Sequence, residues 1–165
     1  MKAVADASAL LWLEYMGVLD DLLNIADIYT TESVNEELKE ITSFRDEKSR
    51  ISKKILLHVS DGKVICIDSK GDKDSKNISL NHCFALCLSA KIPFLLTEDA
   101  DAAYNLGRTA AQKGVKLRTC AAVLVELNKT GKFNTKSARR KLDELMNKRS
   151  WEGGIIEVLA RRYLE

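Results

Sequence analysis

The sequence predicts an α/β protein, a three-layer α/β/α sandwich with a mostly parallel central sheet of about five strands, plus C-terminal helices. Short apolar runs alternate along the chain with longer segments of helical period, which is typical of βαβ units. The length of 165 residues fits one domain, because domains of about 100 to 150 residues are the commonest. We therefore expect a single domain over residues 1–165, in which residues 134–165 form a helical extension packed on the rest.

The first half of the chain supplies three expected strands and the helices between them. Short apolar, β-branched runs predict the strands, and apolar residues at helical spacing predict the helices. Asp6 and Thr31 stand at strand-to-helix junctions, where both residue types cap helices. The expected elements are a strand at 2–6, helices at 7–16 and 18–26, a strand at 27–31, helices at 32–44 and 46–60, and a strand at 63–68.

The second half continues the alternation and ends in helices. The segment 79–91 is apolar on nearly every face, so we expect a helix buried against the sheet. The elements after it are a strand at 94–97, a helix at 100–114, a strand at 115–119 and helices at 120–130, 134–148 and 153–164. One face of the helix 134–148 carries Ala138, Leu142, Leu145 and Met146, so we expect this helix to pack on the body of the protein.

Composition narrows the functional classes. Hydrophobic residues make up 45% of the chain and charged residues 30%, which argues against disorder. The net charge of +2 is too small to indicate a nucleic-acid-binding protein by itself, and each of the basic runs at 43–54, 69–76 and 136–150 is, taken singly, typical of a solvated surface. No apolar run reaches the roughly 18 residues of a membrane span, and no signal peptide is evident, so we expect a cytoplasmic protein.

The cysteines lie inside apolar segments rather than at the regular spacings of a disulfide framework. We therefore expect reduced core residues. His82, Cys83 and Cys87 are close in sequence, but no second pair with ligand spacing accompanies them, so zinc is not expected. The cysteines are Cys66, Cys83, Cys87 and Cys120.

Carboxylates gather where the predicted strands end. Since the carboxyl ends of parallel strands emerge on one edge of the sheet, we expect these side chains to converge. Converging carboxylates repel one another unless a divalent cation neutralises them, and oxygen ligands suit Mg²⁺ or Mn²⁺. The carboxylates are Asp6 after the first strand, Glu37 in the helix after the second, and Glu98, Asp99 and Asp101 after the strand 94–97.

Each of these acids also has a purely structural interpretation. Asp6 can cap the first helix, and Asp99 or Asp101 can cap the helix that begins near residue 100. Glu37 lies in an acid-rich helix, where an exposed carboxylate complements the helix dipole. Only the joint placement of the acids favours a metal site.

Three segments together resemble the PIN domain, the fold of metal-dependent ribonucleases that include VapC-type toxins and RNA-processing nucleases. They are "VADASALLWLEYMGVLDDLL", "IYTTESVNEEL" and "FLLTEDADAAYNLGRTAAQKGVKLRTCAAVLVELNKTGKF". Each motif is short, but their order and spacing are fairly specific and cover nearly the whole chain. The last segment is similar to the branch of the family whose chain continues into further helices after the last strand.

The resemblance implies a role for each acid. The family's first aspartate falls on Asp6, its helical glutamate on Glu37, and the aspartate of its T-x-D motif on Asp99. These residues would be catalytic and would hold Mg²⁺ or Mn²⁺. The further residues implied are Asp101 as a fourth ligand and Ser8, Thr97 and Glu98 as supporting residues.

One position departs from the family pattern. The family has an acid early in the helix before the T-x-D strand, and His82 occupies that slot, flanked by Asn81. Asn81 can ligate Mg²⁺ through its amide oxygen and His82 can ligate Mn²⁺, but neither restores the negative charge.

Three hypotheses of function follow. The first is an RNA endonuclease, the toxin of a toxin–antitoxin pair, whose RNA is held by basic residues such as Arg139, Arg140 and Lys141. The second is a catalytically degenerate PIN domain that binds RNA or a protein, favoured by the missing acid. The third is a phosphotransfer receiver or a DxDxT phosphohydrolase, which the lone acid in "ADAS" disfavours.

The resemblance also implies partners, namely an antitoxin whose segment fills the acidic crevice and a homodimer built on the N-terminal helices. Trp12, Leu13 and Met16 are candidates for the dimer surface, although such residues at helical spacing are more often core. For Trp151 and Tyr163 we likewise prefer core packing to base stacking.

Overall fold

The computed structural model describes residues 1–69, 77–150 and 153–164, and its strands form one sheet in the order β3-β2-β1-β4-β5. Every pair of neighbouring strands is parallel. The predicted α/β class is confirmed, with a sheet that is parallel throughout rather than mostly parallel. The strands are β1 (Lys2–Ala5), β2 (Asp27–Thr31), β3 (Val64–Ile67), β4 (Phe94–Leu96) and β5 (Lys116–Arg118).

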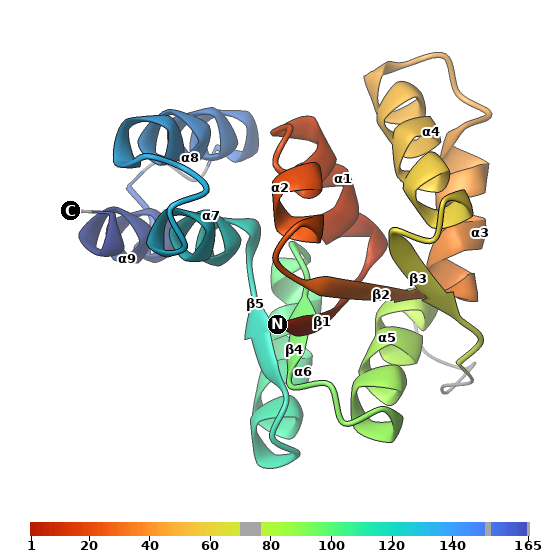
Figure 1. Cartoon of the computed structure of the whole chain (residues 1–165). Helices are drawn as coiled ribbons and strands as arrows, with labels where there is room; N and C mark the ends of the chain where they lie inside the picture. The colour runs from red at the N-terminus through yellow and green to blue at the C-terminus, as the bar shows by residue number, and fades with distance from the viewer. Residues whose placement is uncertain (70–76, 151–152, 165) are drawn as a thin grey trace.

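Helices cover both faces of this sheet, which gives the predicted three layers. Figure 1 shows α1 to α4 on one side of the sheet and α5 and α6 on the other, with α7 to α9 beside α1 and α2. The helices are α1 (Ala7–Tyr15), α2 (Leu19–Leu23), α3 (Glu32–Ile41), α4 (Glu47–Ser60), α5 (Ile78–Ser89), α6 (Ala100–Gln112), α7 (Cys120–Lys129), α8 (Thr135–Arg149) and α9 (Ile155–Tyr163).

The strand order reverses at β1, which pairs with β2 on one side and β4 on the other. Because parallel crossovers are right-handed, the connections that follow β1 and β4 leave to opposite faces and open a crevice at the carboxyl ends of these strands. Ala5 pairs with Leu96 at that end, and the backbone N–H of Asp6 donates to the carbonyl oxygen of Leu96 at 3.1 Å. Asp6 and the segment after β4 therefore leave the sheet side by side.

The core lies between this sheet and the helices on its faces. Ala3, Val4 and Ala5 of β1 are fully buried, as a central strand covered on both faces should be. Leu13 and Met16 are also fully buried, so the core interpretation of these two side chains is confirmed. A homodimer would therefore have to use other residues.

The C-terminal helix α8 contacts the rest of the fold through both polar and apolar side chains. Lys141 Nζ on α8 donates to the carbonyl oxygen of Met16 just after α1, and Arg139 Nη2 donates to that of Leu164 at 3.0 Å. The apolar face of α8 is buried in full, and its members are Ala138, Leu142, Leu145 and Met146.

Two predictions about the C-terminal aromatic residues have different outcomes. Core packing of Tyr163 is wrong, because 62% of this residue is exposed. Trp151 lies outside the described residues.

Cys83, Cys87 and Cys120 are free and buried as predicted, whereas Cys66 is half-buried. Within the described ranges, no helix has both the length and the apolar character needed to cross a membrane.

Candidate functional site at the carboxyl edge of the sheet

Asp6 is the buried centre of the site. Its carboxylate accepts hydrogen bonds at Oδ1 from the backbone N–H of Ala9 at 2.8 Å and the hydroxyl of Ser8 at 2.7 Å. At Oδ2 it accepts the hydroxyl of Thr97 at 2.5 Å. Asp6 is thus the N-cap of α1, one of its two predicted interpretations, and it also binds the segment after β4. A carboxylate oxygen has two lone pairs, so Oδ2 retains acceptor capacity for a further ligand.

Burial makes the carboxyl group of Asp6 a weaker acid than an exposed aspartate. Removal from water raises the pKa of Asp6 from 3.8 to about 6, against the opposing effect of the hydrogen bonds from Thr97, Ala9 and Ser8. The nearby charge of Glu37 raises this pKa further. A buried carboxylate with a second negative charge beside it favours either a bound proton or a bound cation.

Glu37 supplies that second charge from α3. It lies one turn inside the helix, on an exposed position, yet it acts electrostatically on both Asp6 and the thiol of Cys83. Residues 31 positions apart in the chain are thus brought together by the pairing of β1 with β2. Asp6 and Glu37 therefore both follow strands that end at the carboxyl edge of the sheet.

Asp99 stands at the same edge, held by neighbours on two elements. Its backbone N–H donates to Thr97 Oγ1 at 3.2 Å, and its Oδ2 accepts from Asn77 Nδ2 at 2.8 Å. Its carbonyl oxygen accepts from Ala103, so Asp99 occupies the start of α6. Asp101, the fourth predicted ligand, is exposed in the first turn of α6.

The oxygen donors of this edge are of the kind that Mg²⁺ and Mn²⁺ prefer. Among the described residues, however, no three Asp, Glu, His or Cys side chains lie close enough together to surround one ion. At this edge the charge of Glu37 raises the pKa of Asp6, and the Thr97 hydroxyl links the carboxylate of Asp6 to the backbone N–H of Asp99.

A histidine occupies the slot where the family has an acid. His82 Nδ1 lies 3.1 Å from Ser33 Oγ, and Ser33 Oγ lies 2.9 Å from Thr31 Oγ1. His82 Nε2 is buried and has no hydrogen-bond partner among the described residues. Asn81 is half-buried one turn into α5. The site at this position is polar and contains an unused nitrogen, but no negative charge.

The hydrogen bonds of the Thr31 hydroxyl correct a prediction about helix capping. Thr31 occupies the N-cap position of α3, but its hydroxyl makes no capping bond to the helix backbone. It points instead to Ser33 and to Cys83 Sγ, the latter at 3.8 Å. The packing of α5 against α3 at this edge therefore takes the hydroxyl away from the helix end.

Glu98 has a structural role rather than a metal-binding role. It is only 3% exposed, its Oε1 accepts from the backbone N–H of Cys120, and its Oε2 lies 3.6 Å from Arg149 Nη1. Arg149 Nη2 also donates to the carbonyl oxygen of Glu98 at 2.7 Å, and its guanidinium lies 5.3 Å from the ring centroid of Trp12. Desolvation raises the pKa of Glu98, opposed by Cys120 and Arg149. Through these contacts with Arg149, Glu98 links α8 of the C-terminal extension to the carboxyl edge of the sheet.

The predicted RNA-binding residues of α8 divide into two kinds. Arg139 and Lys141 hold carbonyl oxygens of the protein itself, so they fix α8 in place. The side chain of Arg140 is 72% exposed, and its Nε lies 3.8 Å from Glu144 Oε1. Arg139 is also an exposed residue, but its guanidinium donates to a backbone carbonyl oxygen, whereas the ion pair of Arg140 is with another exposed side chain.

Sequence reasoning missed Asn77, Ser33 and Arg149. Asn77 caps α5 through its Oδ1, which accepts from Leu80 at 3.4 Å, while its Nδ2 holds Asp99. Asn77 stands just before an apolar segment of helical period, so its role as an N-cap could have been predicted from the sequence. Ser33 and Arg149 gave no comparable signal, because their partners lie 49 and 51 positions away.

Comparisons with known proteins add no family to this geometry. No protein-family model matches the chain, and none of the curated proteins matches it either. The class defined by the fold is therefore a three-layer α/β/α protein with acidic residues at the switch point of a parallel sheet.

The raised pKa of Asp6 predicts how stability varies with pH. In the folded protein this carboxyl binds its proton more tightly than in the unfolded chain, so its contribution favours folding below about pH 4 and is lost as the pH rises through about 6. At about 1.36 kcal/mol per unit, the free energy of unfolding falls by about 3 kcal/mol over that window. Urea titrations of the wild type and Asp6→Asn from pH 4 to 7 measure it. A difference between the two proteins that does not vary with pH would contradict the prediction.

Proposed function

We propose that the protein is a metal-dependent RNA endonuclease of the PIN type. The observation that carries this proposal is the buried carboxylate of Asp6 at the switch point of a parallel sheet, whose pKa the charge of Glu37 raises and which the Thr97 hydroxyl links to the backbone of Asp99. Structural roles alone do not account for it, because a helix cap requires neither burial nor a second carboxylate beside it. Switch points of open α/β sheets are where ligands bind.

In this proposal the chain's own residues position the ligands of an Mg²⁺ or Mn²⁺ ion. Ser8 and Thr97 orient the two oxygens of Asp6, and Asn77 orients Asp99. Glu37 would complete the set from α3, with Asp101 in the first turn of α6 as the fourth ligand that the family resemblance implies. The ion supplies Lewis acidity, lowering the pKa of a bound water and stabilising charge on a phosphate.

RNA as substrate and an antitoxin as partner are parts of this proposal that come from the family resemblance, and a cytoplasmic location is the part that comes from the apolar pattern of the sequence. Arg140 is the cation of α8 best placed to contact an RNA backbone, since phosphate contacts position the nucleic acid without reading its sequence. A homodimer remains compatible with the proposal, provided that it does not rely on Leu13 and Met16, which are core residues.

The experiment that tests the proposal is cleavage of a mixture of structured RNAs by the purified protein with Mg²⁺, Mn²⁺ or EDTA. Glu37→Gln should lower the rate by about 100-fold, because it removes one ligand charge worth a few kcal/mol in the transition state. Glu36→Gln is the matched control, since it removes the charge of another exposed glutamate one position away on the same helix. Equal activity of both variants, or cleavage that persists in EDTA, would refute a metal site at Glu37.

A second candidate function is a degenerate PIN domain that binds RNA or a protein without cutting. Two observations favour it: His82 stands in the slot of a family acid, and no group of three ligating side chains is assembled among the described residues. In this case Asp6→Asn would leave function unchanged, while charge reversal at Arg140 would not.

Restoring the missing charge distinguishes the two candidates. Position 82 lies beside Cys83, whose thiol senses the charges of Asp6 and Glu37, so His82→Asp places a carboxylate at the same edge. If the site is catalytic, cleavage at limiting Mg²⁺ should increase by about tenfold, which corresponds to about 1.4 kcal/mol.

Gln112→Glu is the control for this substitution, because it adds the same charge at the far end of α6. Cleavage that is equally raised in both variants, or raised in neither, would favour the binding candidate. Circular dichroism confirms that each variant is folded.

A further inference from the structure

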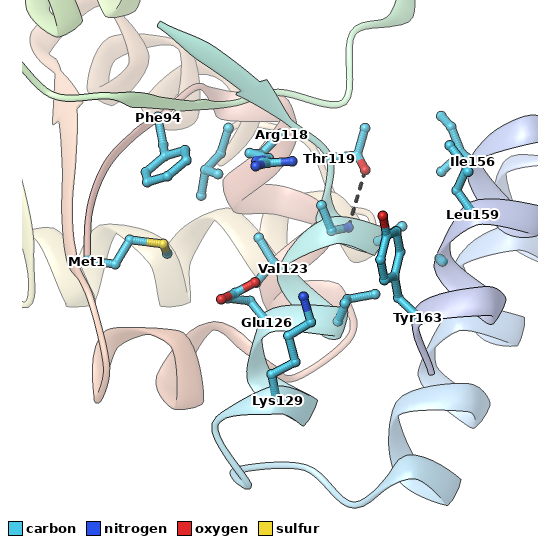
Figure 2. Close-up of a pocket in the computed structure, with 15 residues that line it drawn as sticks. Met1, Phe94, Arg118, Thr119, Val123, Glu126, Lys129, Ile156, Leu159 and Tyr163 are labelled. Atoms are coloured by element: carbon cyan, nitrogen blue, oxygen red, sulfur yellow. Dashed lines mark hydrogen bonds between the residues drawn. The ribbon is translucent and has the colours of Figure 1, made fainter. Parts of the chain in front are cut away.

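A groove of about 450 Å³ is lined by residues of β4, β5, α7 and α9. Figure 2 shows Met1 and Phe94 on one side, Ile156, Leu159 and Tyr163 of α9 on the other, and α7 between them. Aliphatic side chains form most of its surface, including Leu96, Ala121, Ala122, Val125, Ile156 and Leu159. The acids of the proposed site do not line it.

The outer side of α9 extends this apolar surface into solvent. The apolar residues Ile155, Val158 and Leu159 are 70%, 55% and 47% exposed, followed by Tyr163 one turn on. Their spacing of three and four residues makes a continuous ridge along the helix. A contiguous apolar surface of this kind, with a groove beside it, is typical of an interaction site.

Two cations border the groove, one toward each end. The guanidinium of Arg118 lies 5.6 Å from the centroid of Phe94, and Lys129 Nζ lies 5.2 Å from that of Tyr163. In the part of the chain that the structure describes, neither cation forms an ion pair. Glu126 is the acid that lines the groove. The border is therefore positive on balance around an apolar floor.

We propose that this groove binds an acidic amphipathic helix of a partner protein. Its apolar side chains would pack against α7 and the ridge of α9, which is the helix-in-groove mode of recognition. Acids flanking that apolar face would meet Arg118 and Lys129, already oriented by their aromatic neighbours. This inference does not depend on the proposed nuclease activity.

Charge and shape favour this occupant over two others. A second copy of the chain would bring the cations of one groove toward those of the other, and the last turn of α9 adds Arg162, whereas Arg161 in the same turn is paired with Asp143 and Glu157. RNA would find an aliphatic floor and the carboxylate of Glu126, and the rings of Phe94 and Tyr163 are already stacked against cations.

A peptide selection tests the proposal. The probe is a display library of peptides about 18 residues long, five helical turns, with Leu fixed along one face and the other positions randomised among Glu, Lys, Gln and Ser. Peptides are selected on the wild-type protein, and their affinities are measured by fluorescence anisotropy. The groove variants are Leu159→Ser and the double variant Arg118→Gln with Lys129→Gln. Arg140→Gln is the matched control, because it removes an exposed cation outside the groove.

We expect the selected peptides to be acidic and helical, with affinity about tenfold weaker for both groove variants and unchanged for Arg140→Gln. Peptides without net negative charge, equal affinity for wild type and groove variants, or no enrichment at all would overturn the proposal. So would self-association of the wild type, or RNA binding, that is lost in the groove variants.

Discussion

Asp6→Asn is expected to lower metal-dependent RNA cleavage by about 1,000-fold while making the protein more stable at neutral pH. The loss follows from removing the buried carboxylate that anchors the proposed metal site, since such an ion contributes several kcal/mol and each 1.36 kcal/mol is tenfold in rate. The gain follows because Asn carries no charge to bury, whereas the pKa of Asp6 is raised to about 6 by desolvation.

The combination of opposite effects is the informative part of this prediction. A substitution that merely damaged the fold would lower activity and stability together. Cleavage of the RNA mixture with Mn²⁺ and thermal unfolding, both at pH 7.5, measure the two quantities on the same preparation. A variant that is less stable than the wild type, or that still cuts at the wild-type rate, would contradict the account of Asp6 as a buried, charge-strained ligand.

Arg149→Met is expected to lower the free energy of unfolding by about 3 kcal/mol. It removes the ion pair with Glu98, the hydrogen bond to the carbonyl oxygen of Glu98 and the contact with the ring of Trp12. Breaking a buried pair leaves an uncompensated charge, and such losses are about 3 to 5 kcal/mol. For a chain of this size the melting temperature should fall by roughly 6 to 12 °C.

A double variant shows whether the buried charge is the cause. Glu98→Gln combined with Arg149→Met leaves no charge behind, so its loss of stability should be smaller than the sum of the two single losses. Arg140→Met is the matched control on the same helix, and an exposed pair such as Arg140 with Glu144 contributes at most about 1 kcal/mol. Additive losses would mean that Glu98 and Arg149 act independently.

The secondary structure could be predicted from local sequence patterns, because the pattern of each segment agrees with the helix or strand that the segment forms. Alternation of apolar runs with helical segments predicted every strand, and Asp6 was recognised as a candidate N-cap. The strand order was not predictable in the same way, since it depends on pairings between distant segments such as β1 with β4. The order is what creates the switch point at Asp6 and Asp99.

The roles of individual side chains were harder to predict from the sequence than the places of the residues in the fold. Glu98 and Asp99 are adjacent, yet one is braced by Arg149 in the interior and the other faces Asn77 at the crevice. Tyr163 was expected in the core because aromatic residues at helical spacing are usually buried, but α9 packs on α7 and α8 in a way that leaves most of this residue exposed. Burial depends on what packs against a helix, which its own sequence does not contain.

The measurement that tests the central claim most directly is binding of Mn²⁺, followed by the loss of the free-ion signal in electron paramagnetic resonance. The account predicts saturable binding to the wild type, weaker by about tenfold or more in Asp6→Asn and Glu37→Gln and unchanged in Glu36→Gln. Binding that is absent in the wild type, or equal in all four proteins, would show that Asp6 and Glu37 do not form a metal site.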